Sequence, residues 1–482
     1  MKRLVVVLCV GISAAMSSLS AQSNGTRSDS SLDANQQAVS ALFDVFKTPM
    51  SPGCAVSITR DGATVFSAGY GVADIEHGIA ITPRTAFYAA SVSKQFTAAA
   101  IGLLALRGQL VLDASVRDFV PEVPDYGTPI TVRQLLQHTS GLRDFLSLQP
   151  LAGWPEDMGV TEEDFLALVH RQKGLSFAPG TKHLYSNTGY VLLSLIVRKV
   201  SGRSLREFAA QELFAPLGMT NTGFRDNHTA PIPRRATAYD SLASGRFRTR
   251  LPGFDVVGDG GLFTTVEDLA KWNPTMLDGA LHAPGLSALM LTPGTLITGD
   301  TLEYSMGLYR STYRGVPIVR HGGINGGYRA EFRVIPSARM TTAVLCNNRA
   351  AEPYTLANRI MDLYVGDRLA VPTTTTAAAA APRVLATTTP TRPVNASDLV
   401  GNYFSEELDI RWTIIPSAPS GIALRRRNLS PISLASRDTT ETHFTVLGTT
   451  AAVRFERNTV GRVTGFVVDA GDITNIRFVK LQ

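Results

Sequence analysis

The chain has 482 residues, 44% of them hydrophobic, with 46 lysines and arginines against 40 aspartates and glutamates. This length exceeds what one hydrophobic core usually supports and predicts two or three domains. The formal charge is +6 and becomes +4 once Lys2 and Arg3 leave with a leader, an excess too mild to indicate a nucleic-acid partner.

The first predicted element is a secretory signal over residues 1–21. Lys2 and Arg3 precede an apolar stretch from Leu4 to Ala15, and small residues follow up to Ala21. The apolar run is shorter than the ~20 residues that span a bilayer. We therefore expect cleavage before Gln22, a periplasmic or secreted protein, and no stable membrane insertion of the mature chain.

A Ser-x-x-Lys motif, Ser91-Val92-Ser93-Lys94, precedes the apolar helical run from Gln95 to Leu106. Residues three apart share a helix face, so the Ser91 hydroxyl and the Lys94 amine can meet in the first turn. A serine needs such a base to become a nucleophile, and the helix start offers unpaired N–H groups to an oxyanion. The alternative is that the spacing arises by chance, in which case the serine caps a surface helix and the lysine is a solvated charge.

Two further motifs lie at junctions of predicted elements. Tyr185-Ser186-Asn187 comes between a turn at 177–180 and the helical stretch 189–200, where a loop can face a cleft. His321-Gly322-Gly323 follows the strand-like segment 315–319, and its glycines allow another molecule close to the backbone. The alternatives are structural: a helix-capping Tyr185, an N-cap Asn187 and a strand-capping His321.

In this order and spacing the three motifs resemble the active-site elements of the serine hydrolase family that holds class C β-lactamases, D-alanyl-D-alanine carboxypeptidases, D-aminopeptidases and related esterases. The resemblance covers residues 38–369. It includes the framework segments Leu135–Leu142, Pro216–Met219 and Gly258–Leu262. It implies a mixed α/β catalytic domain, similar to β-lactamases and penicillin-binding proteins, with a central antiparallel sheet flanked by helices and an all-helical insert.

Expected strands of this sheet come from both ends of the region, with a helix over 351–369 returning to cover it. The strands are 54–58 and 64–68, joined by a hairpin at Asp61-Gly62, together with 318–320, 328–335 and 341–346. Ser91 and Tyr185 would then lie where the helical insert meets the sheet, a common place for a ligand cleft.

The resemblance also implies roles for the motif residues. Ser91 would attack a carbonyl to form an acyl-enzyme, and Lys94 would take its proton. Tyr185 would act as general base or proton relay, and which of Lys94 and Tyr185 is the base stays open. Asn187 would bind the substrate amide and steady Lys94. The backbone N–H groups of Ser91 and Ile324 would form the oxyanion hole.

The third motif departs from the Lys-Thr-Gly or Lys-Ser-Gly of β-lactamases. A histidine is mostly neutral near pH 7, so His321, beside Gly322 and Gly323 in the substrate-binding strand, should attract a substrate carboxylate less than a lysine does. We therefore expect peptides with D-amino acids, or small esters, as substrates. The alternatives are a β-lactamase or penicillin-binding carboxypeptidase, and a catalytically silent binding protein. The motifs imply no cofactor and no metal.

Cys54 and Cys346 remain after the signal and its Cys9 are removed. Cys54 opens a strand-like segment and Cys346 closes another, and the resemblance makes these segments antiparallel neighbours. In an oxidising compartment a disulfide is then the hypothesis, against two buried free thiols.

After Ala370 the composition changes twice. Residues 370–397 are rich in threonine, alanine and proline and predict a linker. Residues 398–482 contain short alternating strands that predict an antiparallel barrel or sandwich, and they resemble a lipocalin-like domain through 399–403 and 461–466. This domain could shape the substrate entrance, mediate self-association or bind a ligand; the oligomeric state stays open.

Overall fold

The structure is a computed structural model. It describes residues 29–370 except 49, 156–157, 280 and 282, and residues 397–482 except 418–420, 427–429, 437–442 and 447–450. The predicted signal over 1–21 and nearly all of the predicted linker, residues 371–396, lie outside the described residues. Within the described ranges, no helix is long and apolar enough to cross a membrane.

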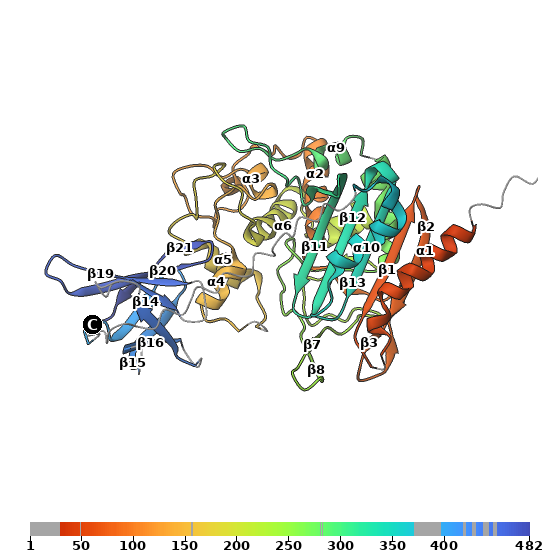
Figure 1. Cartoon of the computed structure of the whole chain (residues 1–482). Helices are drawn as coiled ribbons and strands as arrows, with labels where there is room; N and C mark the ends of the chain where they lie inside the picture. The colour runs from red at the N-terminus through yellow and green to blue at the C-terminus, as the bar shows by residue number, and fades with distance from the viewer. Residues whose placement is uncertain are drawn as a thin grey trace, which may run out of the picture.

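One antiparallel sheet joins the two ends of the catalytic region (Figure 1). In spatial order its strands are β10 (Tyr309–Tyr313), β11 (Val316–Asn325), β12 (Tyr328–Ile335), β13 (Met340–Cys346), β1 (Cys54–Arg60) and β2 (Ala63–Tyr70). The predicted hairpin and the mixed α/β class are therefore confirmed. The expected strand 318–320 is too short, because β11 runs on to Asn325 and includes the whole His-Gly-Gly motif.

Helices cover both faces of this sheet. On one face α10 (Pro353–Val365) packs on β12 and β13, with α1 (Asp29–Leu42) beside it. The other face carries the helical insert, of which α8 (Val266–Asp278) packs on β1 and β13. The buried residues form two hydrophobic cores, one on each face of the sheet. Side chains alternate along β1, so Cys54, Val56 and Ile58 face α10, whereas Ala55 faces the insert. The predicted helix 351–369 thus covers the sheet as expected, although its α-helical part is shorter.

Cys54 and Cys346 form a disulfide between the paired ends of β1 and β13. Both residues are fully buried on the face covered by α10. The bond joins positions 292 residues apart, so it links the first strand of the sheet to the strand that completes it. This confirms the disulfide hypothesis.

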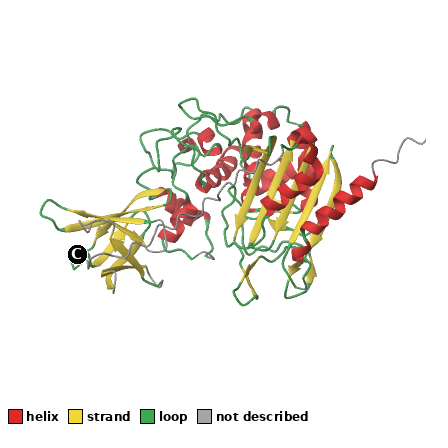
Figure 2. Ribbon diagram, in the orientation of Figure 1, coloured by secondary structure: helices red, strands yellow, loops and turns green. Residues whose placement is uncertain are grey.

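The insert between β2 and β10 is mainly helical, as Figure 2 shows. Its helices are α2 (Lys94–Leu106), α3 (Val132–Leu136), α4 (Phe145–Leu151), α5 (Glu162–His170), α6 (Asn187–Ser201), α7 (Leu205–Ala209), α8 and α9 (Leu286–Leu291). Short strands lie between them: β3 (Val72–Asp74), β4 (Ile79–Ala80), β5 (Phe87–Tyr88), β6 (Gly223–Phe224), β7 (Tyr239–Ser241), β8 (Phe247–Thr249) and β9 (Leu262–Thr264). Helix α2 is buried around most of its circumference and contacts α6 and α9.

The C-terminal segment forms a closed barrel of eight antiparallel strands. They are β14 (Gly401–Ser405), β15 (Ile410–Ser417), β16 (Gly421–Arg426), β17 (Ile432–Ser436), β18 (His443–Val446), β19 (Ala452–Arg457), β20 (Val463–Ala470) and β21 (Ile473–Lys480). The prediction of a barrel or sandwich resolves to a barrel, since β21 pairs back onto β14. Figure 1 places it beside α4 and α5, on the far side of the insert from the sheet.

Candidate active site

Ser91 lies in a short 3-10 turn, Ala90–Ser93, that leads directly into α2. The expected first helical turn is thus a tighter one, and it brings the Lys94 Nζ to 3.2 Å from the Ser91 Oγ. Ala90, just before the serine, has a φ of +47°, which is unusual for a residue with a side chain. This local strain sets the direction in which the chain presents Ser91 at the start of the helix.

The Lys94 amine is held by three acceptors, and the side chain is 0% exposed. Besides Ser91, the Nζ donates to the Asn187 Oδ1 at 2.8 Å and to the carbonyl oxygen of Asp259 at 2.7 Å. The rings of Tyr185 and Tyr190 lie 4.8 and 5.5 Å from the same nitrogen. An ammonium group has three donors, so every one of them has a partner.

Tyr185 and Asn187 are placed by His138. The Ser186 N–H donates to the His138 Nδ1 at 3.1 Å, and the Leu184 N–H donates to the His138 carbonyl at 2.9 Å. The His138 ring packs on Tyr185 with centroids 4.2 Å apart. Helix α6 then begins at Asn187, whose own N–H donates to the Asp144 Oδ1 at 2.6 Å.

The segment 258–262 brings the Asp259 carbonyl to Lys94. Gly258, at φ +115°, packs so closely on the Tyr190 carbonyl that a Cβ atom there would overlap it. Its own carbonyl accepts a hydrogen bond from Thr97 at 2.8 Å. Gly261 is tied to β5, the strand that leads into the nucleophile turn, because its N–H donates to the Tyr88 Oη at 2.9 Å. This segment is therefore a fixed wall of the site.

Strand β11 forms the opposite wall. A Cβ atom at Gly323 would overlap the Ala89 carbonyl, so glycine is what lets the strand lie against the nucleophile turn. His321 is buried, with its Nδ1 2.6 Å from the Gly322 carbonyl and its Nε2 3.3 Å from the Tyr304 hydroxyl. Its Nδ1 therefore carries the proton and donates to the carbonyl, and the hydroxyl donates to its Nε2. Ile324 is 71% exposed.

Burial separates the pKa values of the two possible bases. It lowers the pKa of Lys94 to about 8, although the charges of Asp259 and Asp144 oppose this. Burial also raises the pKa of Tyr185 well above its usual value, and the nearby Ser91 hydroxyl opposes this only partly. The Tyr185 hydroxyl has no partner of hydrogen-bond geometry among the described residues.

Burial also shifts the pKa values of the surrounding groups, each towards its uncharged form. Desolvation raises the pKa of Asp259 to about 6 and raises that of Asp144, with Lys94 opposing both shifts. Burial and the Lys94 charge lower the pKa of His321 to about 3, so this ring is neutral at pH 7. The site therefore holds one amine and two carboxylates, with no cation at the His321 position.

Ser91, Lys94, Tyr185 and Asn187 thus converge, with the His321-Gly322-Gly323 strand beside them. Among the described residues the Ile324 N–H makes no hydrogen bond to this centre, and its place in an oxyanion hole stays a prediction. The sequence analysis did not predict that Asp144 and Asp259 lie at this site. Asp144 is an acidic residue at the start of a helix, four residues before Leu148, and Asp259 is the single charge in a glycine-rich apolar segment, so both sequence signals were weak.

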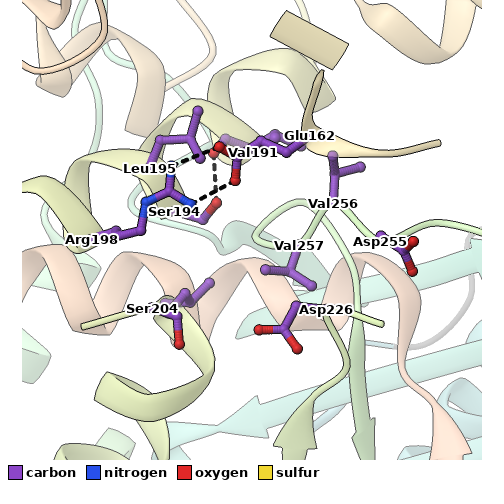
Figure 3. Close-up of a pocket in the computed structure, with 11 residues that line it drawn as sticks. Glu162, Val191, Ser194, Leu195, Arg198, Ser204, Asp226, Asp255, Val256 and Val257 are labelled. Atoms are coloured by element: carbon purple, nitrogen blue, oxygen red, sulfur yellow. Dashed lines mark hydrogen bonds and ion pairs between the residues drawn. The ribbon is translucent and has the colours of Figure 1, made fainter. Parts of the chain in front are cut away.

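Two other features of the described surface bring polar side chains together. A hollow of about 60 Å³ lies along α6 next to Val256 and Val257, and the ion pair between Arg198 and Glu162 borders it (Figure 3). Its volume is far below that of a typical ligand pocket.

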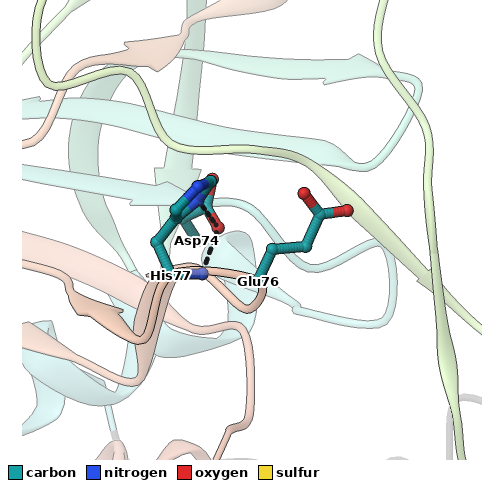
Figure 4. A group of neighbouring side chains, drawn as sticks. All are labelled: Asp74, Glu76 and His77. Atoms are coloured by element: carbon teal, nitrogen blue, oxygen red, sulfur yellow. Dashed lines mark hydrogen bonds and ion pairs between the residues drawn. The ribbon is translucent and has the colours of Figure 1, made fainter.

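The other feature is the acidic turn of Asp74, Glu76 and His77 (Figure 4). Asp74 already accepts from the His77 backbone N–H and lies 2.9 Å from the His77 Nδ1. Glu76 and His77 are exposed, so the cluster is a solvated turn.

Known proteins are similar to this chain in sequence and in fold. The family model described as "Beta-lactamase" matches residues 42–365. A D-aminopeptidase of Cereibacter sphaeroides is 29% identical over 66% of this chain and 61% of its own length. A D-aminopeptidase of Gluconobacter oxydans is 27% identical over 84% of this chain and 75% of its own. The chain thus spans about 61% of the length of the first of these relatives.

Among solved structures, an octameric penicillin-binding protein homologue from Pyrococcus abyssi is similar over 92% of this chain and 99% of its own, with a TM-score of 0.61 and 25% identity. The family model matches more than half of the chain, and the fold is similar to that of the penicillin-binding protein homologue. These findings confirm the expected family, one of serine hydrolases. The chain belongs to the β-lactamase family.

Proposed function

We propose that the chain is an exported serine hydrolase that acts through a covalent acyl-enzyme at Ser91. Its substrates are peptides or amides with a D-amino acid, or small esters. The observation that carries the proposal is the Lys94 amine, buried and bonded to both Ser91 and Asn187. An amine in this position can take the serine proton, which an exposed helix cap could not do efficiently.

Lys94 is the better base of the two candidates. A lowered pKa leaves a usable fraction of the amine neutral near pH 8, whereas a raised phenol pKa leaves Tyr185 protonated. The neutral Lys94 accepts the Ser91 proton as the Oγ–carbon bond forms. The Tyr185 hydroxyl then relays a proton from the Lys94 ammonium to the leaving amine or alcohol, and the bond from the carbonyl carbon to that group breaks. Water then attacks the acyl carbon while Lys94 takes its proton through Tyr185, the Oγ–carbon bond breaks, and that proton returns to the Ser91 Oγ as the acid leaves.

The charges favour a substrate without a carboxylate at the scissile end. His321 is neutral, and the site contains the carboxylates of Asp144 and Asp259 beside Lys94. A substrate carboxylate would meet no cation at the His321 position, whereas a substrate amine would meet negative charge. The two D-aminopeptidase relatives support the same substrate class. β-Lactams, which carry a carboxylate, are the weaker candidates, and export rests on residues 1–21.

The substrate class can be tested by steady-state kinetics on D-alanine and L-alanine p-nitroanilides and on a chromogenic cephalosporin. We expect kcat/KM for the D-anilide to exceed the value for the L-anilide by at least ~10-fold. The cephalosporin should be the poorest of the three. Ser91→Ala should reduce all activity to background. Equal use of both anilides, or a preference for the cephalosporin, would contradict the proposed substrate class.

Replacing the Tyr185 hydroxyl separates a chemical role from a structural one. Tyr185→Phe should lower kcat by ~10²–10⁴-fold, because the proton relay is lost. The midpoint of thermal unfolding should change little, because among the described residues the Tyr185 hydroxyl makes no hydrogen bond of normal geometry. Tyr364→Phe is the matched control: its hydroxyl, on α10, is also buried and has no hydrogen-bond partner within the described part of the chain, so neither kcat nor the midpoint should change. Full activity of Tyr185→Phe would rule out the relay.

The pH dependence of kcat/KM should follow Lys94. Below pH 8 the neutral fraction of an amine with a pKa of about 8 rises with pH, so kcat/KM should rise and then level off. Asp259→Asn removes a charge that raises the Lys94 pKa but keeps the carbonyl that binds the amine. The rising limb should therefore move to lower pH, while Asp113→Asn at an exposed ion pair leaves it in place. A shift to higher pH with Asp259→Asn would show that Lys94 is not the titrating base.

A further inference from the structure

The barrel touches the catalytic region through a buried ion pair. Arg143, 5% exposed, donates to the carboxylate of Glu407, 4% exposed, in the turn between β14 and β15. The Arg143 Nη2 also donates to the Thr474 carbonyl of β21 at 2.7 Å. Glu407 in turn accepts the Lys173 N–H at 2.9 Å. Charged residues are almost never buried without such partners, so this contact is built rather than incidental.

The backbone of Arg143 lies against the first turn of α6. The Thr188 Oγ1 donates to the Arg143 carbonyl at 2.8 Å and accepts the Phe145 N–H at 2.8 Å. Between these two residues, the Asp144 Oδ1 accepts the Asn187 N–H at 2.6 Å. The segment 143–145 is therefore fixed to the residue that binds Lys94, and its other side is fixed to the barrel.

The barrel interior is filled by its own side chains. Trp412 and Phe478 stack with centroids 4.3 Å apart, Phe466 and Phe478 at 4.8 Å, and Tyr403 and Phe466 at 4.7 Å. All four side chains are buried. Eight strands enclose just enough space for such a core, so the outer turns, including the Glu407 turn, are what the barrel presents to the rest of the chain.

We propose that Glu407 and Arg143 form a positioning pair, through which the barrel holds Asn187, and with it the Lys94 amine, in the geometry needed to acylate Ser91. The chain of contacts is Glu407 to Arg143, Asp144 to the Asn187 backbone, and Asn187 Oδ1 to the Lys94 Nζ. Neither Glu407 nor Arg143 contacts the nucleophile; they act through Asn187. The inference rests on the proposed function, since it concerns the same acylation.

The test is active-site titration of the full chain with a fluorophosphonate, which needs no knowledge of the natural substrate. Glu407→Gln keeps the shape of the side chain and removes its charge. We expect every active site to be labelled, with a rate constant ~10–100-fold below wild type, because a small displacement of a catalytic group is costly. On the D-anilide kcat should fall while KM changes less than twofold. A merely structural defect would instead lower the labelled fraction at a normal rate.

A second variant controls for the destabilisation that an unpaired Arg143 would cause in Glu407→Gln. Arg143→Gln with Glu407→Gln leaves no uncompensated buried charge, so the fold should persist while the charged contact is lost. It too should show full labelling at a reduced rate. Ser176→Ala is the matched control, because Ser176 Oγ donates across the same boundary, to the Asp472 carbonyl at 3.0 Å, without contacting Arg143. Its rate should equal wild type.

The outcomes separate this inference from the proposed function. A wild-type rate in either folded Glu407 variant, or a loss confined to the labelled fraction, overturns the positioning pair and leaves the proposed function intact. A wild-type chain that takes up no fluorophosphonate overturns the proposed function and the inference with it. Full labelling at a reduced rate, with Ser176→Ala unaffected, supports the pair.

Discussion

Burying one amine determines the rest of this site. Lys94 lies beneath the surface with no exposed area, where an unpaired charge would be strongly unfavourable. Three oxygen acceptors and two aromatic rings compensate for the lost water. These acceptors come from the nucleophile turn, the start of α6 and the segment before β9, which are far apart in sequence. The need to solvate one nitrogen therefore explains why these three segments meet.

The remainder of the fold keeps this meeting point in place. The sheet brings β11 against the nucleophile turn, which is possible because Gly323 has no side chain. The disulfide joins β1 to β13 and so ties together the two halves of the sheet, which enclose the insert in sequence. The barrel adds a contact from outside, at Arg143. Low local dielectric makes each of these placements matter, because displacement of an acceptor changes the proton affinity of Lys94.

Much of this could be predicted because it is local or belongs to a recognisable motif. The Ser91 to Lys94 spacing, the loop before α6 and the strands at both ends of the region follow from periodicity and resemblance. The full length of β11 was not predicted, because glycines weaken the strand pattern of a sequence, and the strand was therefore expected to end at residue 320. Asp144 and Asp259 were missed because only packing converts a capping acid and a loop acid into neighbours of a buried amine. Arg143 and Glu407 are 264 residues apart, and no local sequence pattern predicts that they form an ion pair.

Intact-mass spectrometry of wild type and Ser91→Ala after exposure to a fluorophosphonate shows directly whether Ser91 is the activated serine. Because the buried amine should activate Ser91 alone among the many serines, we expect a single phosphonyl adduct on wild type, mapped by peptide analysis to Ser91. Ser91→Ala should carry no adduct. Labelling of Ser91→Ala to the same extent, or an unlabelled wild type, would contradict this expectation.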